Sequence, residues 1–195
     1  MPAIAYFITF STYGTWLHGD DRGSVDRKTN IAGEPLLPAN AKLHRSREAL
    51  MTEAEYRMEA VERETVLAAI RQHAEFRGWS LIAVHVRTNH VHIVVAGDAK
   101  PERMMTEFKA YASRALNRMN PREADRKRWT RHGSTRWLNT EESVRRAIEY
   151  TVAEQGEPMA VYQAKDEEGH DTRQAPNEFG NEPRPEGSGQ PGERT

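Results

Sequence analysis

The feature that most constrains this chain is residues 79–97, where two runs rich in β-branched residues flank a polar turn at Thr88 and Asn89. Such a pattern predicts a β-hairpin. His90 and His92 begin the second strand, and side chains alternate between the faces of a strand, so both imidazoles point to one face. The opposite face receives three aliphatic side chains, those of Val91, Ile93 and Val95.

Two imidazoles side by side on a rigid strand form a candidate metal site. Neutral imidazole nitrogens bind divalent cations, and a strand holds residues two apart at a fixed spacing. The chain contains eight histidines, so a His-x-His spacing also arises by chance and is a weak signal by itself. Cysteine is absent, which excludes disulfides and cysteine-based zinc sites and agrees with a reducing cytoplasm.

Length and hydropathy predict a soluble globular protein. The chain has 195 residues, of which 37% are hydrophobic, enough for one domain with a core and an appendage. The apolar opening at residues 4–10 lacks the basic flank and cleavage segment of a secretion signal. No apolar run reaches the roughly eighteen residues of a membrane span, so we expect a cytoplasmic location.

The formal charge of −1 is unevenly distributed along the chain. Residues 157–195 contain four basic and nine acidic side chains, so this segment carries −5 and the first 156 residues carry +4. Within the body, residues 103–146 hold twelve Lys and Arg against five Asp and Glu. This excess of one sign predicts a polyanionic partner.

The first fifty residues begin with a strand and continue as a loop. Residues 3–10 are rich in β-formers and predict the first strand. Residues 12–50 contain four Gly and two Pro without a sustained period, so we expect a long irregular insertion. Long loops in compact domains are often functional, and Tyr13 and Trp16 indicate that part of this one is packed.

Two amphipathic helices are expected on either side of the hairpin. A capping box at residues 52–55 predicts the start of the first helix, and Gly78 its end. Pro101 opens the second, which runs to about residue 119. Its predicted buried stripe comprises Met105, Phe108, Ala112, Ala115 and Met119, and we expect Tyr111 to lie in the core as well.

The last part of the body supplies one more strand and one more helix. Residues 122–131 read as a charged loop, 134–138 as the fourth strand, and 139–155 as a capped third helix ending before Gly156. Beyond about residue 163 the chain is rich in Gly, Pro and Glu, so we divide it into a domain of residues 1–156 and a disordered tail of residues 157–195.

The predicted order of elements is β-α-β-β-α-β-α. This order suggests an α+β fold with a ferredoxin-like sheet of four antiparallel strands, and the first two helices on one face. If Val91, Ile93 and Val95 meet those helices, His90 and His92 lie on the other face, near the third helix.

Two segments of this arrangement resemble a known family. The stretch Thr88-Asn-His-Val-His-Ile-Val-Val95, followed some sixty residues later by Ile148-Glu-Tyr-Thr-Val-Ala-Glu-Gln-Gly156, is similar to the single-tyrosine HUH transposases. That family includes short insertion-sequence transposases and the domesticated transposases associated with repetitive extragenic palindromes. The similarity covers about residues 3–156 and does not extend to the tail.

The resemblance implies a mechanism and a set of catalytic residues. A helix tyrosine, here Tyr150, attacks a phosphodiester of single-stranded DNA and forms a 5′-phosphotyrosine link, while Mg²⁺ or Mn²⁺ held by His90 and His92 polarises the phosphate. A free phenol titrates near pH 10, so the tyrosine needs such assistance. The alternative is that Tyr150 has only a structural role in the core. However, Tyr150 lies off the apolar stripe formed by Val144, Ala147, Ile148, Thr151 and Val152.

The third metal ligand is where the sequence departs from the family pattern. The family has Gln four residues after the tyrosine, whereas here that position is Glu154 and Gln155 follows it. Glu154 lies on the face of Tyr150 in an ideal helix and is our first choice. An early helix end would bring in Gln155 instead. His85, on the preceding strand, is as suited to packing as to ligation.

The basic body predicts contacts with single-stranded or hairpin DNA. Family members can dimerise so that one subunit's tyrosine helix serves the other, and the residues of this chain favour neither a monomer nor a homodimer. The candidates for phosphate contacts are Lys109, Arg114, Arg118, Arg126, Lys127, Arg128 and Arg131.

Other classes of function were weighed against this one. A histidine-triad hydrolase needs a third alternate histidine, where this chain has Val94. A non-catalytic ferredoxin-like nucleic-acid-binding module explains the fold and the charge but predicts exposed aromatic residues on the central strands. A domesticated protein that binds hairpin DNA without mobilising it is an alternative that the sequence does not separate from a mobile element's own enzyme.

Overall fold

The fold was analysed in a computed structural model that describes residues 3–15, 17 and 38–165. The chain divides into two units, residues 1–164 and residues 165–195, and the first contains every helix and strand among the described residues. The strands are β1 (Ala5–Thr12), β2 (Ser80–Val86), β3 (His90–Ala96), β4 (Trp129–Leu138) and β5 (Ala160–Gln163). The helices are α1 (Ala41–Glu48), α2 (Ala60–Arg77), α3 (Pro101–Met119) and α4 (Glu141–Val152), with a short 3₁₀ turn, η1, at Pro121–Glu123.

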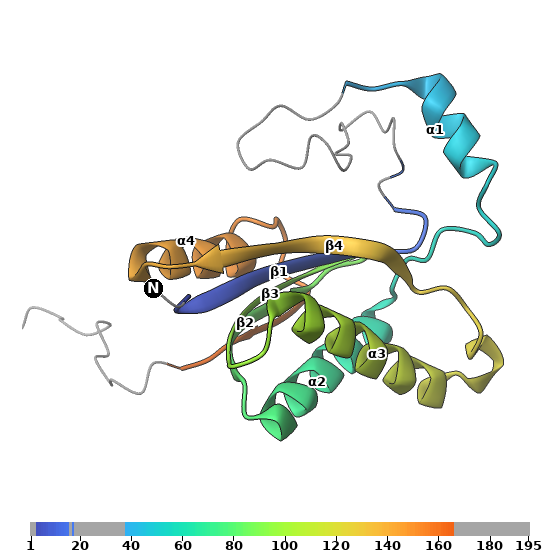
Figure 1. Cartoon of the computed structure of the whole chain (residues 1–195). Coiled ribbons are helices and arrows are strands. Elements are labelled where there is room, and N and C mark those ends of the chain that lie inside the picture. The colour runs from blue at the N-terminus through green and yellow to red at the C-terminus, as the bar shows by residue number, and fades with distance from the viewer. Residues whose placement is uncertain (1–2, 16, 18–37, 166–195) are drawn as a thin grey trace, which may run out of the picture. The chain divides into compact units, whose positions relative to one another are not determined.

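The strands form one antiparallel sheet in the order β4-β1-β3-β2-β5 (Figure 1). The helices α2 and α3 cover one face of the sheet, and α4 covers part of the other. This arrangement confirms the predicted α+β, ferredoxin-like architecture and adds a fifth strand to it.

The predicted hairpin is the centre of the sheet. The strand β3 pairs with β1 on one side and β2 on the other, and the amide of Arg87 donates to the carbonyl of His90 across the turn at 2.8 Å. Three side chains of β3 are fully buried under α2 and α3, those of Val91, Ile93 and Val95. The alternation of the strand therefore sends His90, His92 and Val94 to the opposite face, as predicted.

The second predicted helix has the expected bounds, with Pro101 in its first turn, but its buried stripe differs. Met104 and Leu116 are buried, whereas Met119 is 40% exposed and Ala115 is half-buried. Tyr111, expected in the core, is also exposed. Its ring instead stacks on that of His73 at the edge of the α2–α3 interface, with a centroid distance of 3.7 Å.

The helix α2 begins seven residues later than the capping box at 52–55 predicted. A second capping box, made by Glu59 and Glu62, starts it, and Gly78 ends it with a φ of 66°, as expected. The residues before Glu59 remain extended because Tyr56 and Met58 insert their side chains into the core. Their backbone amides donate to the carbonyls of Tyr13 and Thr88, so this segment is hydrogen-bonded to neighbouring loops and does not form a helix.

The long insertion is not irregular throughout, because it contains α1. Asn40 caps this helix by accepting a hydrogen bond from the amide of Leu43. None of the helix's side chains is buried, so the sequence lacks the apolar stripe by which a helix is predicted. Trp16 and residues 18–37 lie outside the described residues.

The end of the body also differs from the prediction. The strand β4 starts at Trp129 rather than at residue 134, because β1 continues to Thr12 and pairs with it there. The segment expected to begin the tail at residue 157 contains β5, which pairs with β2 and buries Ala160. Only residues 166–195 of the predicted tail lie outside the described residues. Among the described helices, none combines the length and apolar character needed to cross a membrane.

Candidate active site

The site is built on the sheet face that α4 covers. Thr140 caps α4 by accepting from the amide of Ser143, and the helix buries Ala147 and Thr151 against the sheet. Opposite it, the strand β3 presents His90 and His92, whose ring centroids lie 4.8 Å apart. The helix and the hairpin, far apart in the sequence, therefore meet at the two histidines.

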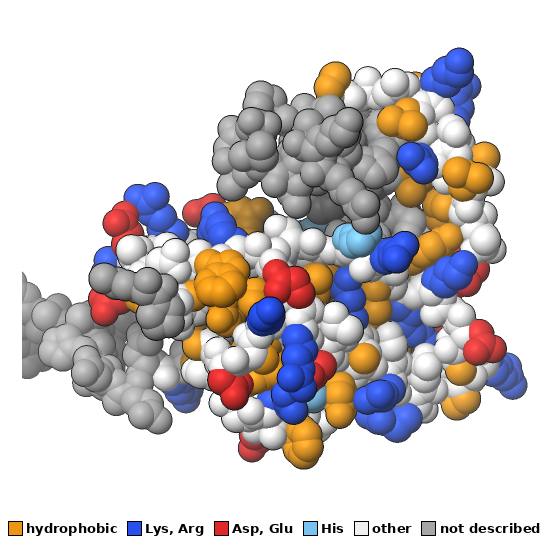
Figure 2. All heavy atoms as spheres, viewed as in Figure 1, with side chains coloured by type: hydrophobic (Ala, Val, Ile, Leu, Met, Phe, Trp, Pro, Cys, Tyr) orange, Lys and Arg blue, Asp and Glu red, His pale blue; other side chains and the backbone are white. Residues whose placement is uncertain are grey.

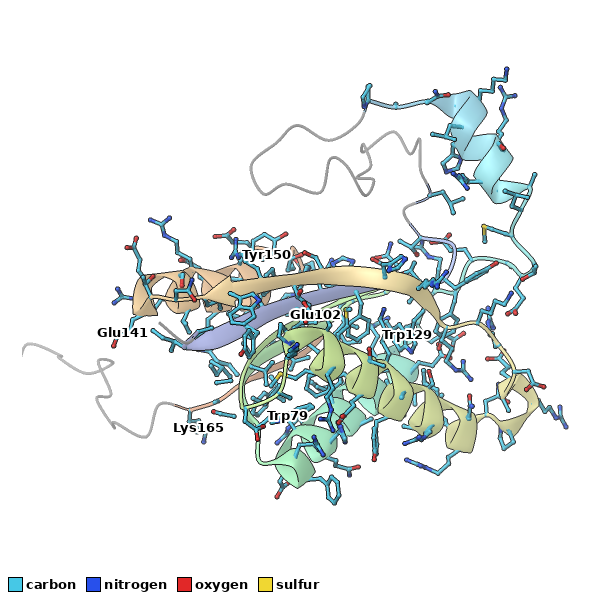
Figure 3. All side chains as sticks on the ribbon, viewed as in Figure 1. Trp79, Glu102, Trp129, Glu141, Tyr150 and Lys165 are labelled. Atoms are coloured by element: carbon cyan, nitrogen blue, oxygen red, sulfur yellow. The ribbon has the colours of Figure 1, made fainter. Side chains whose placement is uncertain are left out.

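Tyr150 lies on α4 beside the histidines, on the side of the sheet away from α2 and α3 (Figure 3). Its side chain is 41% exposed, so it is not a core tyrosine. Its ring meets that of His92 edge to face with a centroid distance of 5.4 Å. A second aromatic ring, that of Phe7 on β1, stacks on His92 at 5.6 Å and contacts Tyr150 edge to face at 5.9 Å.

His92 is held at both ring nitrogens. Its Nδ1 lies 2.8 Å from the hydroxyl of Thr9, and its Nε2 lies 3.1 Å from Oε1 of Gln155. Burial lowers the pKa of His92 to about 3, and the neighbouring His90 adds to this shift. The imidazole is therefore neutral at neutral pH, which is the form that binds a metal ion.

The Nδ1 side of the His90 ring is held by its neighbour Asn89. Its Nδ1 lies 2.8 Å from Oδ1 of Asn89, and a carbonyl oxygen can only accept, so Nδ1 donates. In the neutral ring the lone pair is then on Nε2, the nitrogen that a metal ion would use. Thr9 offers His92 a similar support, because its hydroxyl can accept from Nδ1 when Nε2 binds a metal.

The early end of α4 decides which residue reaches the histidines. The helix ends at Val152 rather than near residue 155, and the chain then turns away from the helical path. Gln155 reaches His92 with its Oε1 and donates from its Nε2 to the carbonyl of Tyr150 at 3.1 Å. Glu154, the first choice of third ligand from the sequence, is exposed beyond the helix. No cluster of three His, Asp or Glu side chains suited to a metal occurs in the described part of the chain.

The residues present fit a divalent cation held by two imidazoles and an amide oxygen. An octahedral ion with bonds near 2.1 Å places neighbouring ligand atoms about 3 Å apart. His92 and Gln155 already hold their Nε2 and Oε1 at 3.1 Å. A proton on His92 now bridges these atoms, and a cation could take its place once that proton moves to Nδ1.

His85 is a packing residue rather than a third ligand. Its side chain is fully buried, its Nδ1 donates to the carbonyl of Thr151 at 2.9 Å, and its Nε2 accepts from the amide of Met159 at 3.2 Å. Arg87, two residues further on, donates to the carbonyl of Glu157 at 2.8 Å. His85 on β2 and Arg87 in the turn after it therefore hold the end of α4 and the segment that carries Gln155 in place.

Two of the seven basic residues predicted to bind phosphates have roles inside the fold. Lys109 donates from Nζ to the carbonyls of Thr130 and His132, both at 3.0 Å, and burial lowers its pKa to about 8. Arg128 is 3% exposed and donates to Asn117. Both tie β4 and the preceding loop to α3, and a buried guanidinium cannot reach DNA.

The other five predicted residues are more accessible. Arg126 pairs with Glu123 at 2.9 Å, Lys127 bonds the hydroxyl of Thr52 at 2.6 Å, and Arg114 packs over the ring of Tyr111. Arg118 and Arg131 are exposed. Figure 2 shows Lys and Arg side chains gathered over α3, which packs on the face of the sheet opposite α4. The predicted basic surface therefore extends over the face that does not carry Tyr150.

Several residues around the site were missed by the sequence analysis. Phe7 and Thr9 on β1 contact His92, and Arg136 on β4 lies over the ring of Phe7. Alternation along residues 3–10 could have indicated which of them face α4. Arg136 gave no such signal, because its position depends on how β4 pairs with β1.

Comparison with known proteins identifies a family. The family model described as "Transposase IS200 like" matches residues 47–146, just over half of the chain. The match includes both histidines of β3 and ends before Tyr150. No match was found among curated protein sequences.

Two solved structures are similar at low identity. A REP-associated tyrosine transposase bound to a REP hairpin is 13% identical, with a TM-score of 0.45, over 78% of this chain and 66% of the other, so this chain spans just under two thirds of that protein. A proposed transposase from Deinococcus radiodurans R1 is 12% identical, with a TM-score of 0.40, over 77% of this chain and 89% of the other.

Proposed function

This chain belongs to the IS200-like transposase family, and from that premise we propose that it cuts and rejoins single-stranded DNA through Tyr150. One observation carries the proposal: an exposed tyrosine on α4 stands 5.4 Å, between ring centroids, from a histidine of the His-x-His pair on β3. A nucleophile and a pair of imidazoles thus converge from two distant segments, as a phosphoryl transfer site requires.

The proposed step is a transesterification. The phenolic oxygen of Tyr150 attacks a phosphodiester phosphorus, the new O–P bond forms, and the bond from phosphorus to the 3′ oxygen breaks. The phenolic proton leaves to solvent and the departing 3′ oxygen gains one, so the products are a 5′-phosphotyrosine and a free 3′-hydroxyl. Attack on that phosphotyrosine by a 3′-hydroxyl from another strand rejoins the DNA and releases Tyr150.

His90, His92 and Gln155 are the proposed ligands of Mg²⁺ or Mn²⁺. When bound, such an ion polarises the phosphate and favours its attack by a phenol that is otherwise a weak nucleophile. Gln155 is favoured over Glu154 because its Oε1 already lies 3.1 Å from the ring of His92. Asn89 and Thr9 orient the two imidazoles from their Nδ1 sides.

The proposed substrate is single-stranded DNA, including strands that fold into hairpins. The accessible cations that could contact its phosphates are Arg114, Arg118, Arg126, Lys127 and Arg131. Phosphate contacts of this kind are independent of sequence and weaken as salt rises.

The alternative of a non-catalytic binding module is less well supported. Such a module would present aromatic side chains on an open sheet face. Here α4 packs on that face, and the ring of Phe7 is partly buried between His92 and Tyr150. The proposal of a domesticated protein that binds hairpin DNA shares the same surface and differs only in how often strands are cut.

The test is a search for a covalent protein–DNA adduct. The protein is incubated with Mn²⁺ and single-stranded hairpin oligonucleotides from its own locus, and adducts are resolved on a denaturing gel. Wild type should form an adduct that Tyr150→Phe lacks, because this change removes the nucleophilic oxygen and preserves the ring. The double variant with His90→Ala and His92→Ala should also form none, and chelator should stop wild type. An adduct with Tyr150→Phe, or full activity in chelator, would place the reaction on other residues.

A further inference from the structure

The ring of Phe7 joins the candidate active site to a side chain on the edge of the sheet. The imidazole of His92 stacks on the ring of Phe7 with an interplanar angle of 10°, and the ring of Tyr150 meets the ring of Phe7 edge to face. The guanidinium carbon of Arg136 lies 5.4 Å from the centre of the same ring. Three functional groups from β3, α4 and β4 therefore surround one aromatic ring of β1.

The pairing of β4 with β1 explains this placement. Arg136 is the partner of Phe7 in the antiparallel register, and paired residues direct their side chains to the same face of a sheet. The neighbouring pair, Leu138 and Ala5, is buried on that face together with Ala147 of α4. Arg136 therefore belongs to the face of the sheet that carries His92 and Tyr150.

The charge of Arg136 is not neutralised within the described residues. Its side chain is exposed, and no hydrogen bond or ion pair joins it to any other side chain or carbonyl that the structure describes. In contrast, Arg146 on α4 pairs with Glu142 at 2.6 Å, and Arg87 donates to a carbonyl. The contact with Phe7 orients the guanidinium while its five N–H donors remain available.

We propose that Arg136 binds the phosphate that Tyr150 attacks. This inference rests on the proposed function and adds a catalytic residue to it, outside the histidines and Gln155. A guanidinium fork matches two non-bridging oxygens of a phosphate. Negative charge on the phosphoryl group must be stabilised as the tyrosine attacks, so a fixed cation beside it accelerates the reaction more than it strengthens binding.

A purely structural role for Arg136 makes a different prediction. The strand β4 is an edge of the sheet, and a charged side chain on an edge strand discourages pairing with other chains. In that role, or as a cover for Phe7, replacement would change stability or solubility and leave the rate of the chemical step unaltered. Lysine would also serve almost as well as arginine, since it keeps the charge and most of the stem.

The experiment compares rates of adduct formation in a single turnover with saturating hairpin DNA and Mn²⁺. Arg136→Gln and Arg136→Lys are measured beside wild type and Arg145→Gln, a matched control that removes an exposed arginine of α4. Removal of one stabilising donor group costs on the order of 100-fold in rate, so we expect Arg136→Gln to be about 30- to 300-fold slower. Arg136→Lys should recover part of this loss, and Arg145→Gln should stay within about twofold of wild type.

DNA affinity and stability complete the design. The dissociation constant, measured in Tyr150→Phe backgrounds to prevent cleavage, should change less than the rate, and the thermal midpoint should stay close to that of wild type. A rate for Arg136→Gln within about twofold of wild type, or a loss confined to DNA affinity, would overturn the proposal. If wild type forms an adduct that Tyr150→Phe lacks, the proposed function stands in either case. If wild type forms none, the proposed function itself fails, and with it this role of Arg136.

Discussion

Replacement of His85 should destabilise the protein strongly, although His85 is not among the proposed ligands or nucleophile. The imidazole is fully buried and bridges the carbonyl of Thr151, at the end of α4, to the amide of Met159, just before β5. In His85→Ala the carbonyl of Thr151 and the amide of Met159 both lose this hydrogen-bond partner in the protein interior. Each orphaned group costs about 1–3 kcal/mol, so the pair costs about 2–6 kcal/mol, and the cavity adds to this loss.

Two further variants separate the contributions to this loss. His85→Phe fills the space but cannot form either hydrogen bond, so it should lose about 2–6 kcal/mol from the two orphaned groups alone. His132→Ala removes an exposed imidazole from β4 and should stay within about 0.5 kcal/mol of wild type.

The assay is equilibrium unfolding in urea, followed by circular dichroism and tryptophan fluorescence at neutral pH. Extrapolation to water gives the free energy of unfolding for each variant, provided that both probes report one transition. A value for His85→Phe within about 1 kcal/mol of wild type would refute the reasoning, because the two hydrogen bonds would then contribute nothing.

Three other changes test separate parts of the structure. Gln155→Ala should slow adduct formation more than Glu154→Ala, because only Gln155 contacts His92; equal losses would contradict this choice of ligand. Arg118→Gln should reduce the slope of log binding constant against log salt by about 0.7, as loss of one contact with single-stranded DNA does, and an unchanged slope would remove Arg118 from the interface. Burial lowers the pKa of Lys109 in the folded protein to about 8, so between pH 8 and 10.5 the unfolded chain should hold more protons at Lys109 than the folded one. The free energy of unfolding should therefore rise with pH in this range, by up to about 1.4 kcal/mol per pH unit. Urea titrations of Lys109→Met, run in parallel, should lack this rise.

Much of the fold was predictable because its signals are local. The hairpin follows from two runs of β-formers around a polar turn, and α3 from a proline at its start and an apolar period of helical spacing. Strand alternation alone separates the buried valines from the two histidines. The position of Tyr150 off the apolar stripe of α4 likewise predicts that its side chain is accessible, as the structure shows.

Where local signals competed or were absent, tertiary packing decided which secondary structure formed and which side chains were buried. Residues 52–55 carry a sound capping signal, but burial of Tyr56 and Met58 holds the chain extended and delays α2. The strand β5 lies in a segment of mixed composition and forms because β2 offers it an unpaired edge. A count of charges also cannot show that Lys109 and Arg128 donate their hydrogen bonds within the protein. The carbonyl and amide groups that accept these bonds lie on other elements.

The sequence by itself determined that two imidazoles share one face of a strand and that a tyrosine lies off the apolar stripe of a later helix, because both follow from the periods of 2.0 and 3.6 residues. Only the tertiary structure decided what joins them. The early end of α4, fastened by His85, directs Gln155 rather than Glu154 to His92. The register of β4 on β1 brings Arg136 to the same face. Helix ends and strand registers depend on partners distant in sequence, so no local pattern encodes them.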